Sequence, residues 1–189
     1  MDREKAWKLL NEYTKTDSLI KHALAVEAAM RHYAEYYGED PDYWGVVGLL
    51  HDFDYEMFPD AQNHPYRGNE ILAREGYPEE MRKAIMGHAD YTGTERDTLL
   101  AKTLFAVDEL AGFVIAVALV RPSQSVYDVT PQSVRKKFKQ HSFAAKVNRE
   151  EIRQGIAELG VEESEHIQRV IDALKTIAKD LKLEGNLSV

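Results

Sequence analysis

The sequence contains no cysteine among its 189 residues. A chain without thiols forms no disulfides, binds no zinc through thiolates and has no cysteine nucleophile. It also lacks the G-x-S-x-G segment that presents the nucleophilic serine of α/β-hydrolases. Any metal site must therefore use nitrogen and oxygen ligands.

Basic residues are fewer than acidic residues, with 24 Lys and Arg against 32 Asp and Glu and a formal net charge of -8. This excess of negative charge disfavours general binding to nucleic-acid phosphates or anionic lipids, so we expect neither nucleic acid nor a membrane as a partner. The longest apolar run, Leu110 to Val120, is shorter than the roughly 20 residues that span a bilayer. The first residues, MDREKAWKLL, lack the pattern of a signal peptide, and we expect a cytoplasmic protein.

Apolar residues recur three and four positions apart along most of the chain, whereas the alternation typical of strands is weak. Asp40 and Pro41 open one apolar segment, and Gly38 and Gly160 close two others, as helix caps do. The spacing predicts helices over residues 17–37, 41–51, 65–75, 78–88, 98–120, from 131, 148–160 and 163–183. Because no linker or repeat separates them, we expect an all-α fold, a compact multi-helix bundle in a single domain over residues 1–189.

Asp108 has the least favourable surroundings of any charged residue in this pattern. On a helix it would share its face with Ala101, Leu104, Ala111 and Ile115, which are all apolar. An unpaired buried carboxylate costs several kcal/mol, so this side chain needs a cationic partner, a metal ion or a proton. The alternative is a helix rotated so that the carboxylate reaches solvent.

Several histidines, like Asp108, lie on successive predicted segments and mostly beside apolar residues. Taken singly, each is typical of a hydrogen-bonded core or loop histidine rather than a ligand. Taken together with two aspartates, they offer nitrogen and oxygen donors that suit zinc, iron or manganese. The candidate ligands are His22, His51, Asp52, His64, His88 and Asp108.

Three further histidines, His32, His141 and His166, lie in polar surroundings or away from the apolar seam, and we predict that they are surface residues. The basic stretch RKKFK at 135–139 is typical of a solvated helix face.

The candidate ligands resemble those of the HD superfamily of metal-dependent phosphohydrolases, which is named for an adjacent His and Asp. In that family an early helix supplies a histidine, a second helix ends in the doublet, and a later helix supplies an aspartate. Here His22, His51 with Asp52, and Asp108 in the stretch LFAVDELAGF match those positions. The resemblance covers about residues 19–115 and implies an HD-domain-like helical bundle, which helices over 130–183 would complete or cover.

A subset of the family binds two metal ions through two additional histidines. The stretches HPYRGNEIL, which begins at His64, and IMGHADYTG, which contains His88, resemble those insertions. The resemblance implies one ion held by His22, His51, Asp52 and Asp108, and a second completed by His64 and His88 with Asp52 bridging. The ions would be divalent, from among Fe, Mn, Zn, Co and Mg.

Four residues near this ligand set are candidates for direct roles in a reaction. Asp52 would hold the ions that activate water, and Asp54 would orient a ligand histidine or take a proton. Arg67 and Lys102 are candidates for binding a substrate phosphate, Lys102 because it matches a lysine of some dinuclear family members, although both could be ordinary surface charges.

The expected function is hydrolysis of a phosphomonoester or phosphodiester, with a nucleotide or related small phosphorylated molecule as substrate and a metal-activated hydroxide as nucleophile. The same ligands would also serve an HD-fold diiron oxygenase acting on a small polyol or phosphonate. A third interpretation is a non-catalytic helical binding or regulatory module. Neither the substrate, the metal nor the oligomeric state follows from the sequence.

Overall fold

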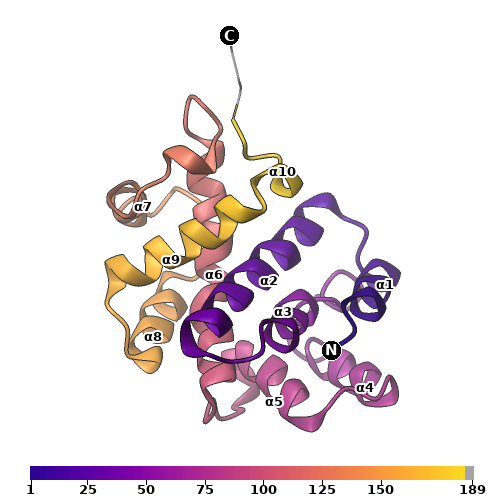
Figure 1. Cartoon of the computed structure of the whole chain (residues 1–189). Coiled ribbons are helices and arrows are strands. Elements are labelled where there is room, and N and C mark those ends of the chain that lie inside the picture. The colour runs from indigo at the N-terminus through magenta and orange to yellow at the C-terminus, as the bar shows by residue number, and fades with distance from the viewer. Residues whose placement is uncertain (186–189) are drawn as a thin grey trace.

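Helices joined by short loops make up the chain, and the computed structural model describes residues 1–185 (Figure 1). This described part contains ten α-helices and no strand, which confirms the all-α prediction. The helices are α1 (Arg3–Tyr13), α2 (Asp17–Tyr37), α3 (Pro41–Leu50), α4 (Tyr66–Arg74), α5 (Glu79–His88), α6 (Leu99–Leu119), α7 (Pro131–Phe138), α8 (Arg149–Leu159), α9 (Glu163–Thr176) and α10 (Ala178–Leu181).

A sharp reversal between α2 and α3 begins to build the site. Gly38 ends α2 with a left-handed backbone (φ 74°), a conformation that a residue without Cβ adopts at no steric cost. Asp40 then caps α3 by accepting hydrogen bonds from the backbone N–H groups of Asp42 and Tyr43, with Pro41 in the first turn. Because α3 packs back along α2, Gly48 lies against the backbone of Val26 and Glu27, and the end of α3 comes beside His22.

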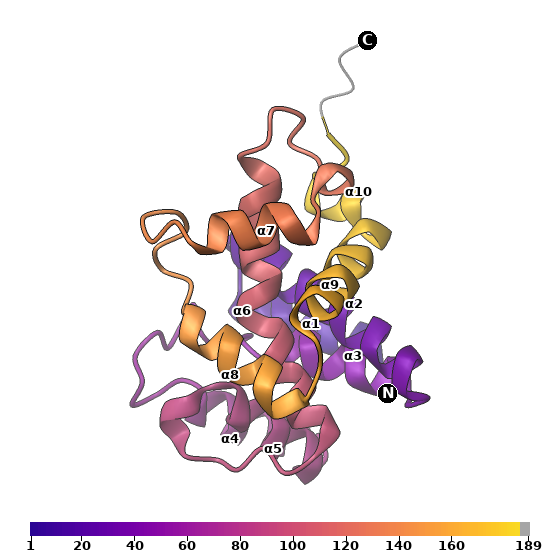
Figure 2. The ribbon, with the colours of Figure 1, turned by 90° about the vertical axis from the view of Figure 1, so that its left-hand side faces the viewer.

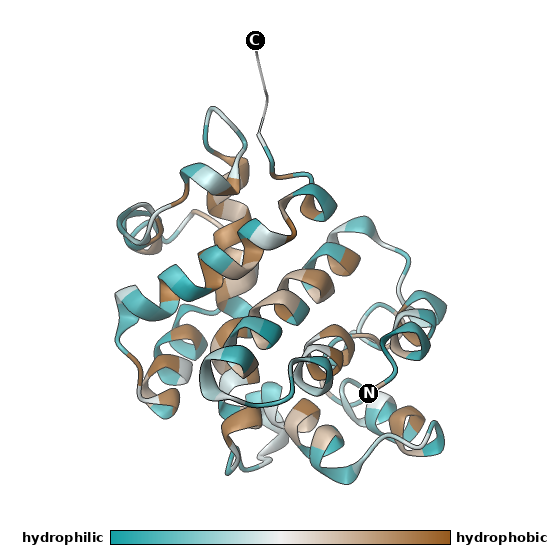
Figure 3. Ribbon diagram, viewed as in Figure 1, coloured by the Kyte–Doolittle hydropathy of each residue, from teal (hydrophilic) through white to brown (hydrophobic). Residues whose placement is uncertain are grey.

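Helix α6 is the central element, and it contacts α2, α3 and α5 as well as α7, α8 and α9. Figure 2 shows α7 and α8 crossing α6, with α9 beside them. Hydrophobic residues lie mainly on the faces that the helices turn toward one another (Figure 3). One cluster of buried hydrophobic residues extends from Ala6 to Leu183, so the C-terminal helices share a core with the helices that carry the candidate ligands.

Two elements differ from the sequence-based expectations. The helix expected over 163–183 is broken at Ile177 (φ -119°, ψ 22°), which lets α10 turn and bury Ala178 and Leu181, with α10 packed against α2. Helix α1 was not expected; the Asp2 side chain caps it by accepting from the backbone N–H of Lys5. Within residues 1–185, no helix combines the length and the apolar character needed to cross a bilayer.

The prediction of a surface position was wrong for His166. Its side chain is fully buried, with Nε2 donating to the carbonyl of Ala106 (2.9 Å) and Nδ1 accepting from the hydroxyl of Tyr33 (2.5 Å). Burial lowers the pKa of this imidazole to about 4. Its polar neighbours in sequence lie on the outer face of α9, whereas the ring points inward to α2 and α6. His141 is exposed and His32 partly exposed.

Candidate metal centre

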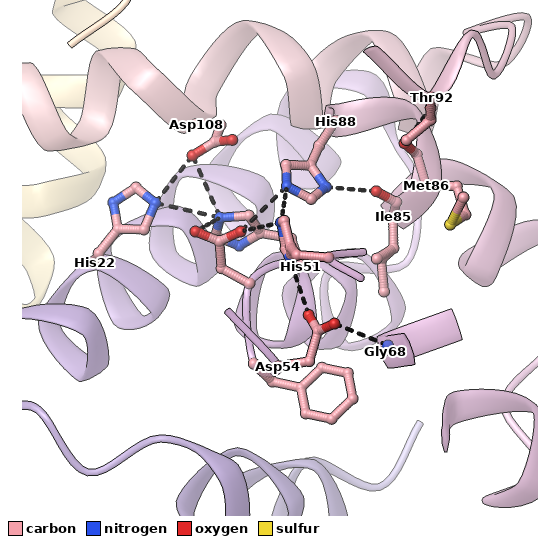
Figure 4. Close-up of polar contacts among 12 residues, drawn as sticks. His22, His51, Asp54, Gly68, Ile85, Met86, His88, Thr92 and Asp108 are labelled. Carbon is pink, nitrogen blue, oxygen red and sulfur yellow. Dashed lines mark hydrogen bonds and ion pairs between the residues drawn. The ribbon is translucent and has the colours of Figure 1, made fainter. Parts of the chain in front are cut away.

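The fold brings all six candidate ligands into one cluster (Figure 4). They come from three helices and the segment that joins α3 to α4: His22 from α2, His51 and Asp52 from the start of that segment, His64 from its end, His88 from the last residue of α5, and Asp108 from α6. The cluster divides into two groups of three, and within each group the potential donor atoms lie within 4.8 Å of one another.

The first group contains His22, His51 and Asp108. Asp108 Oδ1 lies 2.9 Å from His22 Nε2 and 3.3 Å from His51 Nε2, and the two nitrogen atoms are 3.2 Å apart. Asp108 is partly buried rather than enclosed, with its side chain 15% exposed, and two imidazoles face its carboxylate.

The second group contains Asp52, His64 and His88. Asp52 Oδ1 lies 3.2 Å from His64 Nε2 and 3.1 Å from His88 Nε2, and these nitrogen atoms are 3.3 Å apart. The other carboxylate oxygen, Oδ2, lies 3.7 Å from Nε2 of His51 in the first group. Asp52 thus stands between the groups with one oxygen toward each.

Three of the four histidines donate a hydrogen bond through Nδ1 to an acceptor behind the ring. The pairs are His51 with the carbonyl of Gly48 (2.7 Å), His88 with the carbonyl of Ile85 (2.5 Å) and His64 with Asp54 Oδ1 (2.9 Å). An imidazole that carries its proton on Nδ1 presents the lone pair of Nε2, which is the form that binds a metal ion. These residues fit a divalent ion in both donor type and tautomer.

Asp54 hydrogen-bonds Nδ1 of His64, on the far side of the ring from the candidate metal-binding nitrogen, and does not line the space between the candidate ligands. Its carboxylate is buried and also accepts from the backbone N–H of Gly68 (2.8 Å). A Cβ at position 68 would lie 2.7 Å from the Asp54 carboxyl carbon, so this contact requires the glycine of the HPYRG stretch. Asp54 thus contacts a candidate ligand histidine directly, and its role in orienting that ring or taking a proton stays a prediction.

The imidazoles and carboxylates of the cluster shift one another's pKa values. Burial opposes protonation of His51, but the carboxylates of Asp108 and Asp52 outweigh it and raise the pKa to about 9. The pKa of His64 is likewise about 9, because Asp52 and Asp54 outweigh the effect of burial. In turn, the histidines hold the pKa values of the Asp52 and Asp108 carboxyls below their usual range despite burial. Binding of a divalent ion would release protons from these imidazoles.

Residues 19–112 match the HD domain family, and this range contains all six residues of the cluster. The chain belongs to the HD superfamily. HD domains are typically metal-dependent hydrolases that bind divalent metals. No curated protein and no solved structure matches the chain.

A cavity of about 450 Å³ opens over the candidate ligands. Five of the six candidate ligands line it, whereas His51 is completely buried. Its other lining residues are Tyr55, Ala89, Asp90, Tyr91, Glu109, Gly112, Lys146, Val147, Asn148 and Glu151. Four of these residues, 146–148 and 151, lie beyond the matched range, in the loop before α8 and its first turn.

Sequence reasoning missed this C-terminal wall. The backbone N–H of Asn148 donates to Glu109 Oε2 (3.2 Å), and the Asn148 side chain donates to Glu151 Oε1 (2.8 Å). Burial and the adjacent carboxylate of Asp108 raise the pKa of Glu109 to about 7. The pattern predicted a helix from residue 148, and Asn148 caps α8, but nothing in the pattern indicated that this residue lies beside α6.

The two predicted phosphate ligands do not line the cavity. Arg67 pairs with Glu70 (3.0 Å) on the exposed face of α4. Lys102 lines a separate surface depression together with Arg96 and Glu158. Among the residues that the structure describes, the lysine that lines the cavity is Lys146 and not Lys102.

Proposed function

We propose that this HD-domain protein is a metal-dependent phosphohydrolase that acts on small phosphoesters with two divalent ions. The proposal is supported mainly by two groups, each of two histidines and one aspartate, that adjoin through Asp52 and lie beneath a cavity open to solvent. The first ion would be held by His22, His51 and Asp108, and the second by Asp52, His64 and His88. Nitrogen with carboxylate oxygen suits Fe, Mn, Zn and Co better than Mg, which prefers oxygen alone.

Two ions so held would supply Lewis-acid activation of water and neutralise the charge that develops on phosphoryl oxygens. The protein's own groups position this chemistry. Asp52 keeps the two groups adjacent, with one oxygen toward each, and Asp54 fixes the plane of the His64 ring. Lys146, which is exposed at the edge of the cavity, can reach a phosphate oxygen that enters. Arg67 and Lys102 would contact only a substrate that extended beyond the cavity.

Metal analysis combined with activity assays tests the proposal. We expect about two ions per chain, falling to about one in His64→Ala, because the first group keeps its ligands. The protein loaded with Mn²⁺ or Co²⁺ should hydrolyse p-nitrophenyl phosphate or bis-p-nitrophenyl phosphate. His141→Ala removes an exposed histidine outside the cavity and should change neither result.

Two other outcomes would overturn the proposal in favour of a named alternative. Consumption of dioxygen with iron, without phosphoester hydrolysis, would indicate the oxygenase, because the same ligand set can serve redox-active iron. Absence of bound metal after reconstitution, with the same stability in wild type and a His51→Ala, Asp52→Ala double variant, would indicate a binding module.

A further inference from the structure

The walls of the cavity carry more negative than positive charge. Asp90, Glu109 and Glu151 line it above the ligand groups, and Lys146 is the cation among its described lining residues. This contrasts with the floor, where two divalent ions would outweigh the charges of Asp52 and Asp108. The phosphoryl group of a substrate therefore finds positive charge only at the floor and at one edge.

Two of these carboxylates have no cationic partner within residues 1–185. Glu109 and Glu151 are both partly buried, and each accepts one hydrogen bond from Asn148, through the backbone N–H and the side-chain amide respectively. Each therefore keeps a carboxylate oxygen free to accept from a ligand. Asp90 differs, because Arg96 and Gln154 contact its carboxylate.

Another part of the cavity wall is aromatic, with Tyr55 and Tyr91. Tyr55 packs edge-on against His64, and Tyr91 donates its hydroxyl to the carbonyl of His64 (2.8 Å), so both rings are placed beside the second ligand group. A volume of about 450 Å³ is within the range for small-molecule sites. The substrate that fits is thus a small molecule whose phosphate faces the candidate ligands at the floor of the cavity and whose other groups lie near the tyrosines and carboxylates.

Building on the proposed function, we infer that the site takes phosphomonoesters whose remaining part carries hydroxyl or ammonium donors, and selects against those that carry a second anionic group there. A donor can satisfy the free oxygens of Glu109 and Glu151. A carboxylate or further phosphate would face the carboxylates of Asp90 and Glu151 inside a partly desolvated cavity, where like charges repel more strongly than in water.

Glycerol 3-phosphate and 3-phosphoglycerate form a matched pair of probes, because they differ by a hydroxymethyl group in place of a carboxylate. Calorimetric titration of the Mn²⁺-loaded protein should give a dissociation constant roughly tenfold lower for glycerol 3-phosphate, as a unit charge about 10 Å away predicts at an effective dielectric constant near 20. Glu151→Gln keeps the side-chain size and should reduce this ratio by about half an order of magnitude or more. Glu150→Gln, one residue earlier and outside the cavity, should leave the ratio unchanged.

Equal or tighter binding of 3-phosphoglycerate would overturn the inference, as would a ratio that Glu151→Gln does not change or failure of both probes to bind. The titration measures binding and the p-nitrophenyl phosphate assay measures hydrolysis, so failure of the inference can be told apart from failure of the proposed function. If the selectivity is found but p-nitrophenyl phosphate is not hydrolysed under any metal, the proposed function fails while the cavity's preference stands.

Discussion

Asp54→Asn removes one charge behind a ligand and leaves the shape of the site almost unchanged. The carboxylate of Asp54 is 1% exposed and accepts from two donors, His64 Nδ1 at 2.9 Å and the backbone N–H of Gly68 at 2.8 Å. An amide of the same size has one oxygen, so its NH₂ group must face one of these donors. His64 then loses either its acceptor or its orientation.

The magnitude follows from the kind of bond that is lost. Hydrogen bonds to a charged group contribute about 1.5–3 kcal/mol, and loss of such a partner behind a ligand typically lowers metal affinity about 10–100-fold. At 1.36 kcal/mol per factor of ten, this is about 1.4–2.8 kcal/mol, and it should fall on the Asp52, His64 and His88 group alone. Calorimetric titration of metal-free protein with Mn²⁺ should therefore show one weakened and one unchanged class of site.

Asp60→Asn is the matched control, because it removes the same charge from the same loop. Asp60 is exposed, and its side chain accepts hydrogen bonds from Gln62 and Asn63, which an asparagine can also do. Its link to His64 is a bond from the His64 backbone N–H to the Asp60 backbone carbonyl (2.9 Å), which the substitution leaves in place. Equal weakening of both classes in Asp54→Asn, or a change of less than about threefold in either, would refute the reasoning.

Three further changes test other parts of the fold. Gly68→Ala should destabilise the metal-free protein by about 1–3 kcal/mol in urea unfolding, because its Cβ would lie 2.7 Å from the Asp54 carboxyl carbon; unchanged stability would contradict this contact. Arg96→Ala should lower the free energy of unfolding by about 1.5–3 kcal/mol in the same urea experiment. The Arg96 guanidinium is buried, donates two bonds of 2.7 Å to Glu158 of α8 and donates a third to the carbonyl of Gly87 (2.9 Å), so Arg96→Lys should restore only part of the lost stability. His166 has a pKa of about 4 in the folded protein and near 6.5 in the unfolded chain, so the unfolded chain binds more protons between these pH values. The free energy of unfolding of the metal-free protein should therefore fall as pH falls from about 6.5 to 4, by up to roughly 1.4 kcal/mol per pH unit. In His166→Gln this slope should flatten, and an identical slope in both proteins would argue against a neutral buried imidazole.

The parts of the fold that local chemistry determines were predictable. Asp40 with Pro41, and Gly38, are capping signals that depend on neighbouring residues alone, and the helices they bound begin and end as predicted. Asp108 was identifiable for a similar reason, since its helical neighbours are apolar and a buried carboxylate requires a partner.

Features that depend on contacts distant in sequence were not predictable from one chain. His166 has polar neighbours, and only the packing of α9 against α2 and α6 shows that its ring is enclosed by Tyr33 and Ala106. The cavity wall at Lys146 and Asn148 depends in the same way on α8 packing along α6. Side-chain charge suggested Arg67 as a phosphate ligand and the family resemblance suggested Lys102, but Arg67 pairs with Glu70 on an exposed face and Lys102 lines a separate surface depression.

The adjacency of His51 and Asp52 has a geometric explanation in the two groups. His51 still has helical dihedral angles (φ -58°, ψ -37°), and neighbouring side chains on a helix point about 100° apart. That divergence lets the Asp52 carboxylate face both groups of candidate ligands at once. His51 accordingly lies in the first group, while Asp52 directs Oδ1 to the second and leaves Oδ2 3.7 Å from His51. The end of α3 therefore sets the spacing of the two groups, and insertion of a residue between these positions would separate them.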